Sequence, residues 1–115
     1  MPRVFDGAEL LERVDNDWEF LGDTVRMLEA DGPALLEEIR RSADAGDAAS
    51  AGRAAHTLKG MISNFCAPDA QAGALAVEQM GKSGDLSSLR PGLQSLETQV
   101  RSLIAELNEF LDTRA

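Results

Sequence analysis

The sequence is poor in aromatic residues, with no tyrosine, one tryptophan and four phenylalanines among 115 residues. β-Branched residues are also few beside Ala, Leu and Glu, and this balance favours helices over strands. Cys66 is the single cysteine, which excludes an intramolecular disulfide and leaves no second thiolate for a zinc site. We therefore predict an all-α fold, with Cys66 as a small residue near a helix end.

Positive charge is scarce as well. The chain has 11 Lys and Arg against 20 Asp and Glu, a formal net charge of -9. Nucleic-acid phosphates require a basic protein surface, and anionic membranes attract one. We therefore expect neither nucleic acid nor a membrane as a partner.

Long apolar runs are missing from the chain. No stretch approaches the about 18 apolar residues of a membrane span, and residues 1–6 contain no apolar run typical of a signal peptide. These features predict a cytoplasmic protein. A length of 115 residues with 43% hydrophobic content suits one core, so residues 1–115 are predicted to form a single domain.

Capping signals and Gly/Pro breaks divide the chain into about six helices. Capping boxes at Asp6 and at Asn16 with Glu19 open the first two. Asp31-Gly32-Pro33 is predicted to end the second and start the third, and Pro91-Gly92 to delay or kink the last. Short turns favour antiparallel neighbours, so we expect an antiparallel four-helix bundle with additional short N-terminal helices. The predicted helices cover residues 6–14, 16–31, 33–45, 48–65, 68 to between 81 and 84, and 89–110.

The only histidine, His56, lies on the polar side of the predicted helix 48–65. Gly52 and Gly60 stand four residues before and after it, and Ser63 shares the same face. A glycine costs about 1 kcal/mol relative to alanine in a helix interior, and neither glycine belongs to the apolar stripe, so no packing role is expected for them. We interpret them as access for a partner that approaches the imidazole closely. The opposite, apolar stripe consists of Ala51, Ala55, Leu58, Ile62 and Phe65.

The segments around His56 carry a family resemblance. The run Ala55-His56-Thr57-Leu58-Lys59-Gly60 follows the break at residues 45–47 and precedes the segment 78–86. Together, and over nearly the whole chain in helix order and length, they resemble the histidine-containing phosphotransfer (HPt) domains of multistep two-component phosphorelays. Met61 and Cys66 stand where this family often has small residues, a departure that affects local packing.

The resemblance implies that His56 takes a phosphoryl group from the aspartyl phosphate of one receiver domain and hands it to another. It also implies that Lys59 steadies the phosphoryl oxygens and that Gly60 leaves room for them. The sequence has neither a glycine-rich ATP loop nor a carboxylate cluster suited to magnesium. We therefore expect a phosphocarrier and not an enzyme, without a cofactor or metal site of its own, with Mg²⁺ only in the partner. The expected partners are receiver domains of response regulators and hybrid sensor histidine kinases.

Glu78 is a candidate for an orienting role. If the predicted helix 48–65 and the next predicted helix, which begins at residue 68, form a hairpin folded about position 67, Glu78 lies opposite His56. A carboxylate there would hold one ring nitrogen and leave the other free to attack.

The same hairpin, folded about position 67, would bring Lys82 near Gly52 and Arg53. These residues would form a small basic patch on an otherwise acidic protein, which favours an acidic receiver pocket. The alternative for Arg53, Glu78 and Lys82 alike is a solvated helix surface without a role.

Two other functions remain open at this point. A docking module of the same fold would bind receivers without being phosphorylated, although the intact His-x-x-Lys-Gly run argues against it. A small hydrolase would use His56 as a base, but Ser63 as its nucleophile lies seven residues away, about 10 Å along the helix. Because the apolar stripes are consumed within one bundle, we expect a monomer.

Overall fold

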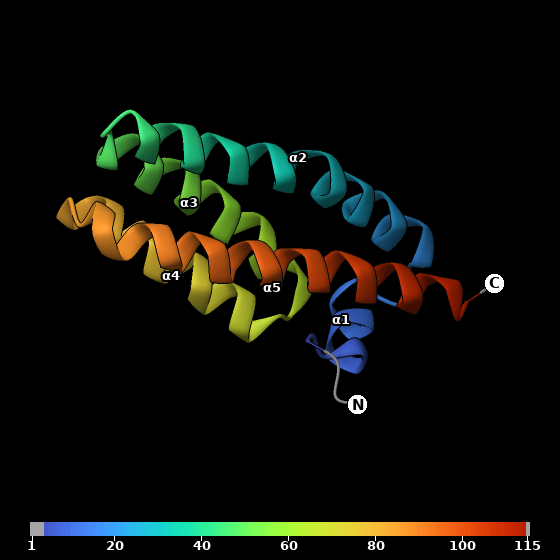
Figure 1. The fold of residues 1–115 in the computed structure, drawn as a ribbon. Coiled ribbons are helices and arrows are strands. Elements are labelled where there is room, and N and C mark those ends of the chain that lie inside the picture. Colours follow the sequence, from blue (N-terminus) through green and yellow to red (C-terminus); the bar gives the residue numbers. More distant parts are fainter. Residues whose placement is uncertain (1–3, 115) are drawn as a thin grey trace.

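The computed structural model describes residues 4–114, and its regular elements are helices (Figure 1). The four long helices form an antiparallel bundle in which α2 and α4 each contact both α3 and α5. The short α1 lies near the C-terminal end of α5 (Figure 1). The prediction of an all-α, antiparallel four-helix bundle is confirmed. The elements are α1 (Gly7–Arg13), α2 (Trp18–Asp44), α3 (Ala48–Ile62), the 3₁₀ turn η1 (Ser63–Phe65), α4 (Pro68–Ser83) and α5 (Leu86–Asp112).

One predicted helix boundary is wrong. Helix α2 continues through Asp31-Gly32-Pro33, so the predicted second and third helices are a single element and the α-helices number five within residues 4–114. The Pro33 ring is exposed. Proline has no N–H to offer the carbonyl one turn earlier, and on the exposed side of the helix that carbonyl can bond to water instead. Gly32 is buried, and a Cβ at this position would meet the side chains of Leu28 and Val100. The apolar stripe of α2 continues past Pro33 and packs against α5, and this packing outweighs the local helix-breaking signal.

Other helix ends differ from the prediction by a few residues. Helix α2 is capped by Asp17, not Asn16, because Asp15 and Asn16 adopt the left-handed conformation in the preceding turn. Helix α5 begins at Leu86 and accommodates Pro91 within it. Helix α3 ends at Ile62 instead of Phe65, and η1 follows.

Aspartates begin four of the five α-helices. In each case the side-chain carboxylate accepts the backbone N–H three residues later, which satisfies a donor that the first helical turn leaves without a partner. Helix α4 instead begins with proline at its first position, and after its last residue, Ser83, it is capped by Gly84 with φ +76°. The antiparallel hairpin of α3 and α4 is therefore delimited by strong local signals. The four capping residues are Asp6, Asp17, Asp47 and Asp85.

The core consists of the facing apolar stripes of the four long helices. It is closed at one end by an aromatic cluster in which Phe110 contacts Phe5 and Trp18, with ring centroids 5.3 and 5.2 Å apart respectively. This core fixes the exposed polar side of α3 relative to α4. The largest fully buried side chains are Leu10, Leu21, Leu28, Ile39, Leu58, Ile62, Leu89, Leu96, Leu103, Leu107, Val25 and Val77.

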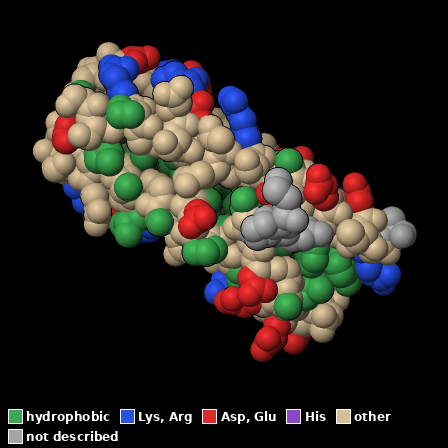
Figure 2. Space-filling model, turned by 60° about the horizontal axis from the view of Figure 1, so that its bottom comes forward, with side chains coloured by type: hydrophobic (Ala, Val, Ile, Leu, Met, Phe, Trp, Pro, Cys, Tyr) green, Lys and Arg blue, Asp and Glu red, His purple; other side chains and the backbone are tan. Residues whose placement is uncertain are grey.

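The surface is polar with isolated apolar side chains. Figure 2 shows a face with scattered hydrophobic side chains and several acidic ones, on which no histidine is visible. The large apolar residues that are exposed include Phe20, Met27 and Leu75. Among residues 4–114, no helix combines the length and the apolar character needed to cross a membrane.

Candidate functional site

His56 lies in the middle of α3, on the side that borders α4. Its side chain is 65% exposed, whereas the apolar residues on the opposite side of the same helix are buried. The Asp47 cap holds the start of α3 by accepting hydrogen bonds from the backbone N–H and the hydroxyl of Ser50. The histidine therefore projects from a well-anchored helix into an open groove beside α4.

The partner of the imidazole is Glu78 on α4. Its Oε2 lies 2.9 Å from Nδ1 of His56, and its side chain is only 3% exposed. Glu78 is the one charged residue that is buried among residues 4–114. Because an unpaired charge is costly to bury, its surroundings must supply compensating donors.

Two lysines supply that compensation. The Lys59 ammonium lies 2.7 Å from Oε1 of Glu78, and the Lys82 ammonium lies 3.1 Å from Oε2. The Lys59 contact is the main cause that lowers the pKa of Glu78 from 4.5 to about 2; the Lys82 and His56 contacts add to it, and burial opposes all three. Glu78 is therefore an anion at neutral pH.

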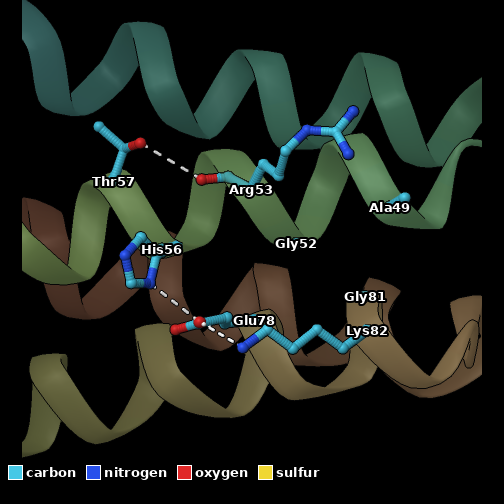
Figure 3. A pocket seen from close by; sticks show the side chains of 8 residues that line it. All are labelled: Ala49, Gly52, Arg53, His56, Thr57, Glu78, Gly81 and Lys82. Carbon is cyan, nitrogen blue, oxygen red and sulfur yellow. Dashed lines mark hydrogen bonds and ion pairs between the residues drawn. The ribbon is translucent and has the colours of Figure 1, made fainter.

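The ionised state of Glu78 determines the arrangement of the imidazole. A carboxylate can only accept hydrogen bonds, so Nδ1 of a neutral His56 must carry the proton and donate it to Oε2. The lone pair of the neutral ring is then on Nε2. This nitrogen makes no hydrogen bond within residues 4–114 and points away from Glu78 (Figure 3). The chemistry available here is that of an oriented, exposed nucleophile.

An open hollow surrounds this pair. Its volume is about 650 Å³, enough for a phosphoryl group together with part of an approaching partner. Figure 3 shows His56 and Lys82 converging on Glu78 along the seam between α3 and α4. The hollow is lined by Ala49, Gly52, Arg53, His56, Thr57, Glu78, Gly81 and Lys82.

Comparison with protein families identifies this chain. The family model of the Hpt domain matches residues 23–110. The chain belongs to the Hpt family. Hpt domains are the histidine phosphotransfer modules of two-component phosphorelays, phosphocarriers that interact with receiver domains and are not classical enzymes. Neither the curated proteins nor the solved structures give a significant match.

The match covers most of the bundle but not α1. It begins within α2 and ends near the C-terminus of α5, so α3 and α4, with His56 and Glu78, lie inside the Hpt region. No cluster of three or more possible His, Cys, Asp or Glu metal ligands occurs in the described part of this Hpt domain.

The structure separates the two glycines that flank His56. A Cβ at Gly60 would meet no atom of the described residues within 4 Å, which agrees with an access role. Gly52 is buried and faces α4, where a Cβ would lie 3.2 Å from the carbonyl oxygen of Glu78. The expectation that neither glycine has a packing role is therefore wrong for Gly52, because it lies on the α4 side of the helix.

The remaining predicted site residues lie at different distances from the imidazole. Lys59 and Lys82 both reach the site through Glu78. Arg53 lines the hollow, but its guanidinium donates to Ser50 and is directed away from Glu78 (Figure 3). Ser63 lies outside the hollow, where its hydroxyl donates to the carbonyl of Gly60 at 2.6 Å.

Sequence reasoning missed Gly81, which lines the hollow from α4. The reflection about position 67 that paired His56 with Glu78 also pairs Arg53 with position 81. The sequence could therefore have indicated Gly81, because this pairing places a second glycine across the hairpin from the neighbourhood of Gly52.

Proposed function

We propose that His56 is the phosphoryl-carrying residue of this Hpt domain, loaded from the aspartyl phosphate of one receiver domain and unloaded onto the aspartate of another. The observation that carries the proposal is the 2.9 Å contact between Nδ1 and Glu78. It turns the only histidine of the chain into a nucleophile with one nitrogen fixed and the other exposed.

The transfer balances without a further reactant. The Nε2 lone pair forms the N–P bond as the P–O bond of the acyl phosphate breaks, and the departing aspartate keeps the bonding electrons. The ring retains its Nδ1 proton and becomes cationic on phosphorylation, so the Glu78 carboxylate stabilises charge that develops during the reaction. Transfer to a second receiver reverses these steps.

Positive charge beside the ring suits the phosphoryl group. Phosphoryl transfer depends mainly on positioning and on charge stabilisation, and two lysines already lie around Glu78. Lys82 is 71% exposed, so its ammonium can turn from Glu78 toward phosphoryl oxygens, and Lys59 contributes charge from the more buried side, at 25% exposure. The magnesium ion would be held by the receiver, and this domain would need no cofactor.

The partner surface follows from the same charges. The lysines stand out on a protein with a net charge of -9, and they favour the acidic phosphorylation pocket of a receiver over other acidic surfaces. Gly60 leaves the rim next to His56 open. Such an encounter would be transient, between a monomeric Hpt domain and one receiver at a time.

The test is phosphoryl transfer from a phosphorylated receiver domain to the purified protein. We expect the label to be acid-labile and base-stable, as phosphohistidine is, and to be lost in His56→Gln with helix content and melting temperature nearly unchanged. Labelling of that variant would refute the assignment to His56. Receiver binding without labelling of the wild type would instead indicate the docking module.

A further inference from the structure

Helices α3 and α4 approach each other closely beside the candidate site, at two facing glycines. A Cβ at Gly81 would lie 2.5 Å from Cα and 2.6 Å from the backbone nitrogen of Gly52, and 2.8 Å from the carbonyl oxygen of Ala48. All three atoms belong to backbone, which cannot rotate away as a side chain can. Position 81 therefore accepts only glycine at the observed helix spacing.

The two glycines lie on the same helix contact as the pair formed by His56 and Glu78. Gly52 lies one turn before His56 on α3, and Gly81 lies three residues after Glu78 on α4, so each glycine is on the same face as its neighbour. Along the contact between α3 and α4, Gly52 therefore faces Gly81, and one turn further the imidazole of His56 faces the carboxylate of Glu78. The distance between the helix backbones at the two glycines therefore determines whether the Glu78 carboxylate can reach the imidazole.

We propose that Gly81 is a positioning residue for His56: its backbone contact with Gly52 holds α4 close enough to α3 for the Glu78 carboxylate to bond Nδ1 of the imidazole. The part of this inference that concerns transfer rates rests on the proposed function. The part that concerns the ring nitrogens does not.

The geometry sets the size of the effect. Non-bonded heavy atoms pack at about 3.5–4 Å, so a methyl group at position 81 requires the helices to separate locally by about 1 Å. The same movement one turn further along the helices would lengthen the 2.9 Å contact between His56 and Glu78 beyond hydrogen-bonding distance. The imidazole would then lose its fixed tautomer while remaining exposed.

The direct readout is the tautomer of His56 in Gly81→Ala. Because this is the only histidine in the chain, long-range ¹H–¹⁵N correlation spectra report its two ring nitrogens without overlap. We expect the neutral ring of the wild type to be protonated at Nδ1, and that of the variant to show a mixture of tautomers. The rate of phosphoryl acceptance should fall roughly tenfold to a hundredfold, as for a misplacement of about 1 Å.

Two further glycine variants separate positioning from general packing. Gly22→Ala on α2 is the matched control, since its Cβ would meet only the flexible Arg26 side chain, at 3.4 Å or more, and it should leave both readouts unchanged. Gly52→Ala, with closest contacts of 3.2 and 3.3 Å, should shift the tautomer in the same direction as Gly81→Ala but by less.

A double variant tests the route of the effect. If Gly81 acts through Glu78, then Gly81→Ala combined with Glu78→Gln should be no slower than the slower single variant, whereas independent effects would multiply. A folded Gly81→Ala with the wild-type tautomer and rate would overturn the inference, as would unfolding of both Gly81→Ala and Gly52→Ala. A changed tautomer in a protein whose wild type accepts no phosphoryl group would refute the proposed function and leave the positioning role standing.

Discussion

Removing the charge of Glu78 should destabilise the protein in a pH-dependent way. Glu78→Gln keeps the size of the side chain but leaves Lys59 and Lys82 without their anionic partner. The folded-state pKa of Glu78 is lowered from 4.5 to about 2, and such a shift corresponds to about 3 kcal/mol of stabilisation. Because the Lys82 side chain is 71% exposed, solvent screening reduces this to about 1–2 kcal/mol.

The sign of the pH dependence follows from the lowered pKa. A carboxyl whose pKa is lower in the folded than in the unfolded protein stabilises the fold above the unfolded value, and this contribution is lost as the pH falls through the folded value. The difference in free energy of unfolding between wild type and Glu78→Gln should therefore be complete at pH 7. It should shrink as the pH falls from about 4.5 towards 2.

Urea denaturation followed by circular dichroism at pH 7, 4.5 and 3 measures this difference. Glu12→Gln is the matched control, because Glu12 is exposed and has no ion pair in the described part of the chain, so it should change the unfolding free energy by less than about 0.5 kcal/mol. A deficit in Glu78→Gln that stays constant from pH 7 to pH 3 would refute the argument. The loss would then come from packing and not from the carboxylate charge.

Lys59→Ala should slow phosphoryl transfer or shorten the lifetime of the phosphorylated form without abolishing labelling, since the lysine contributes charge and not the bond; wild-type kinetics would remove it from the site. Gly60→Gln should melt at the same or a higher temperature, because glycine is several tenths of a kcal/mol less favourable in a helix and a Cβ meets no described atom there, yet transfer should fall further than in Gly60→Ala. Pro33→Ala should raise the urea midpoint, because it restores a donor to a continuous α2; a lower midpoint would contradict the account of that helix. Sedimentation at micromolar concentration should show a monomer, and a stable dimer would be the contrary result.

The local signals of the chain predict most of the helices. Aspartate caps, and a proline at the start of α4, act within one turn of the backbone, so they can be recognised without knowledge of the neighbouring helices. The same local reasoning fails at Pro33. There the apolar residues on either side keep one helical period across the proline, and their burial against α3 and α5 decides the conformation.

For the site, the sequence alone determined that His56 is the only histidine and that it lies opposite an apolar stripe. A hairpin reflection could place Glu78 near it, because short turns impose antiparallel pairing. The hairpin pairing could not give the distance between the Glu78 carboxylate and the imidazole. Whether the carboxylate bonds Nδ1 or lies solvated depends on how closely two helix backbones approach, and that is decided in tertiary structure by Gly52 meeting Gly81 and by two lysines that keep a buried carboxylate ionised.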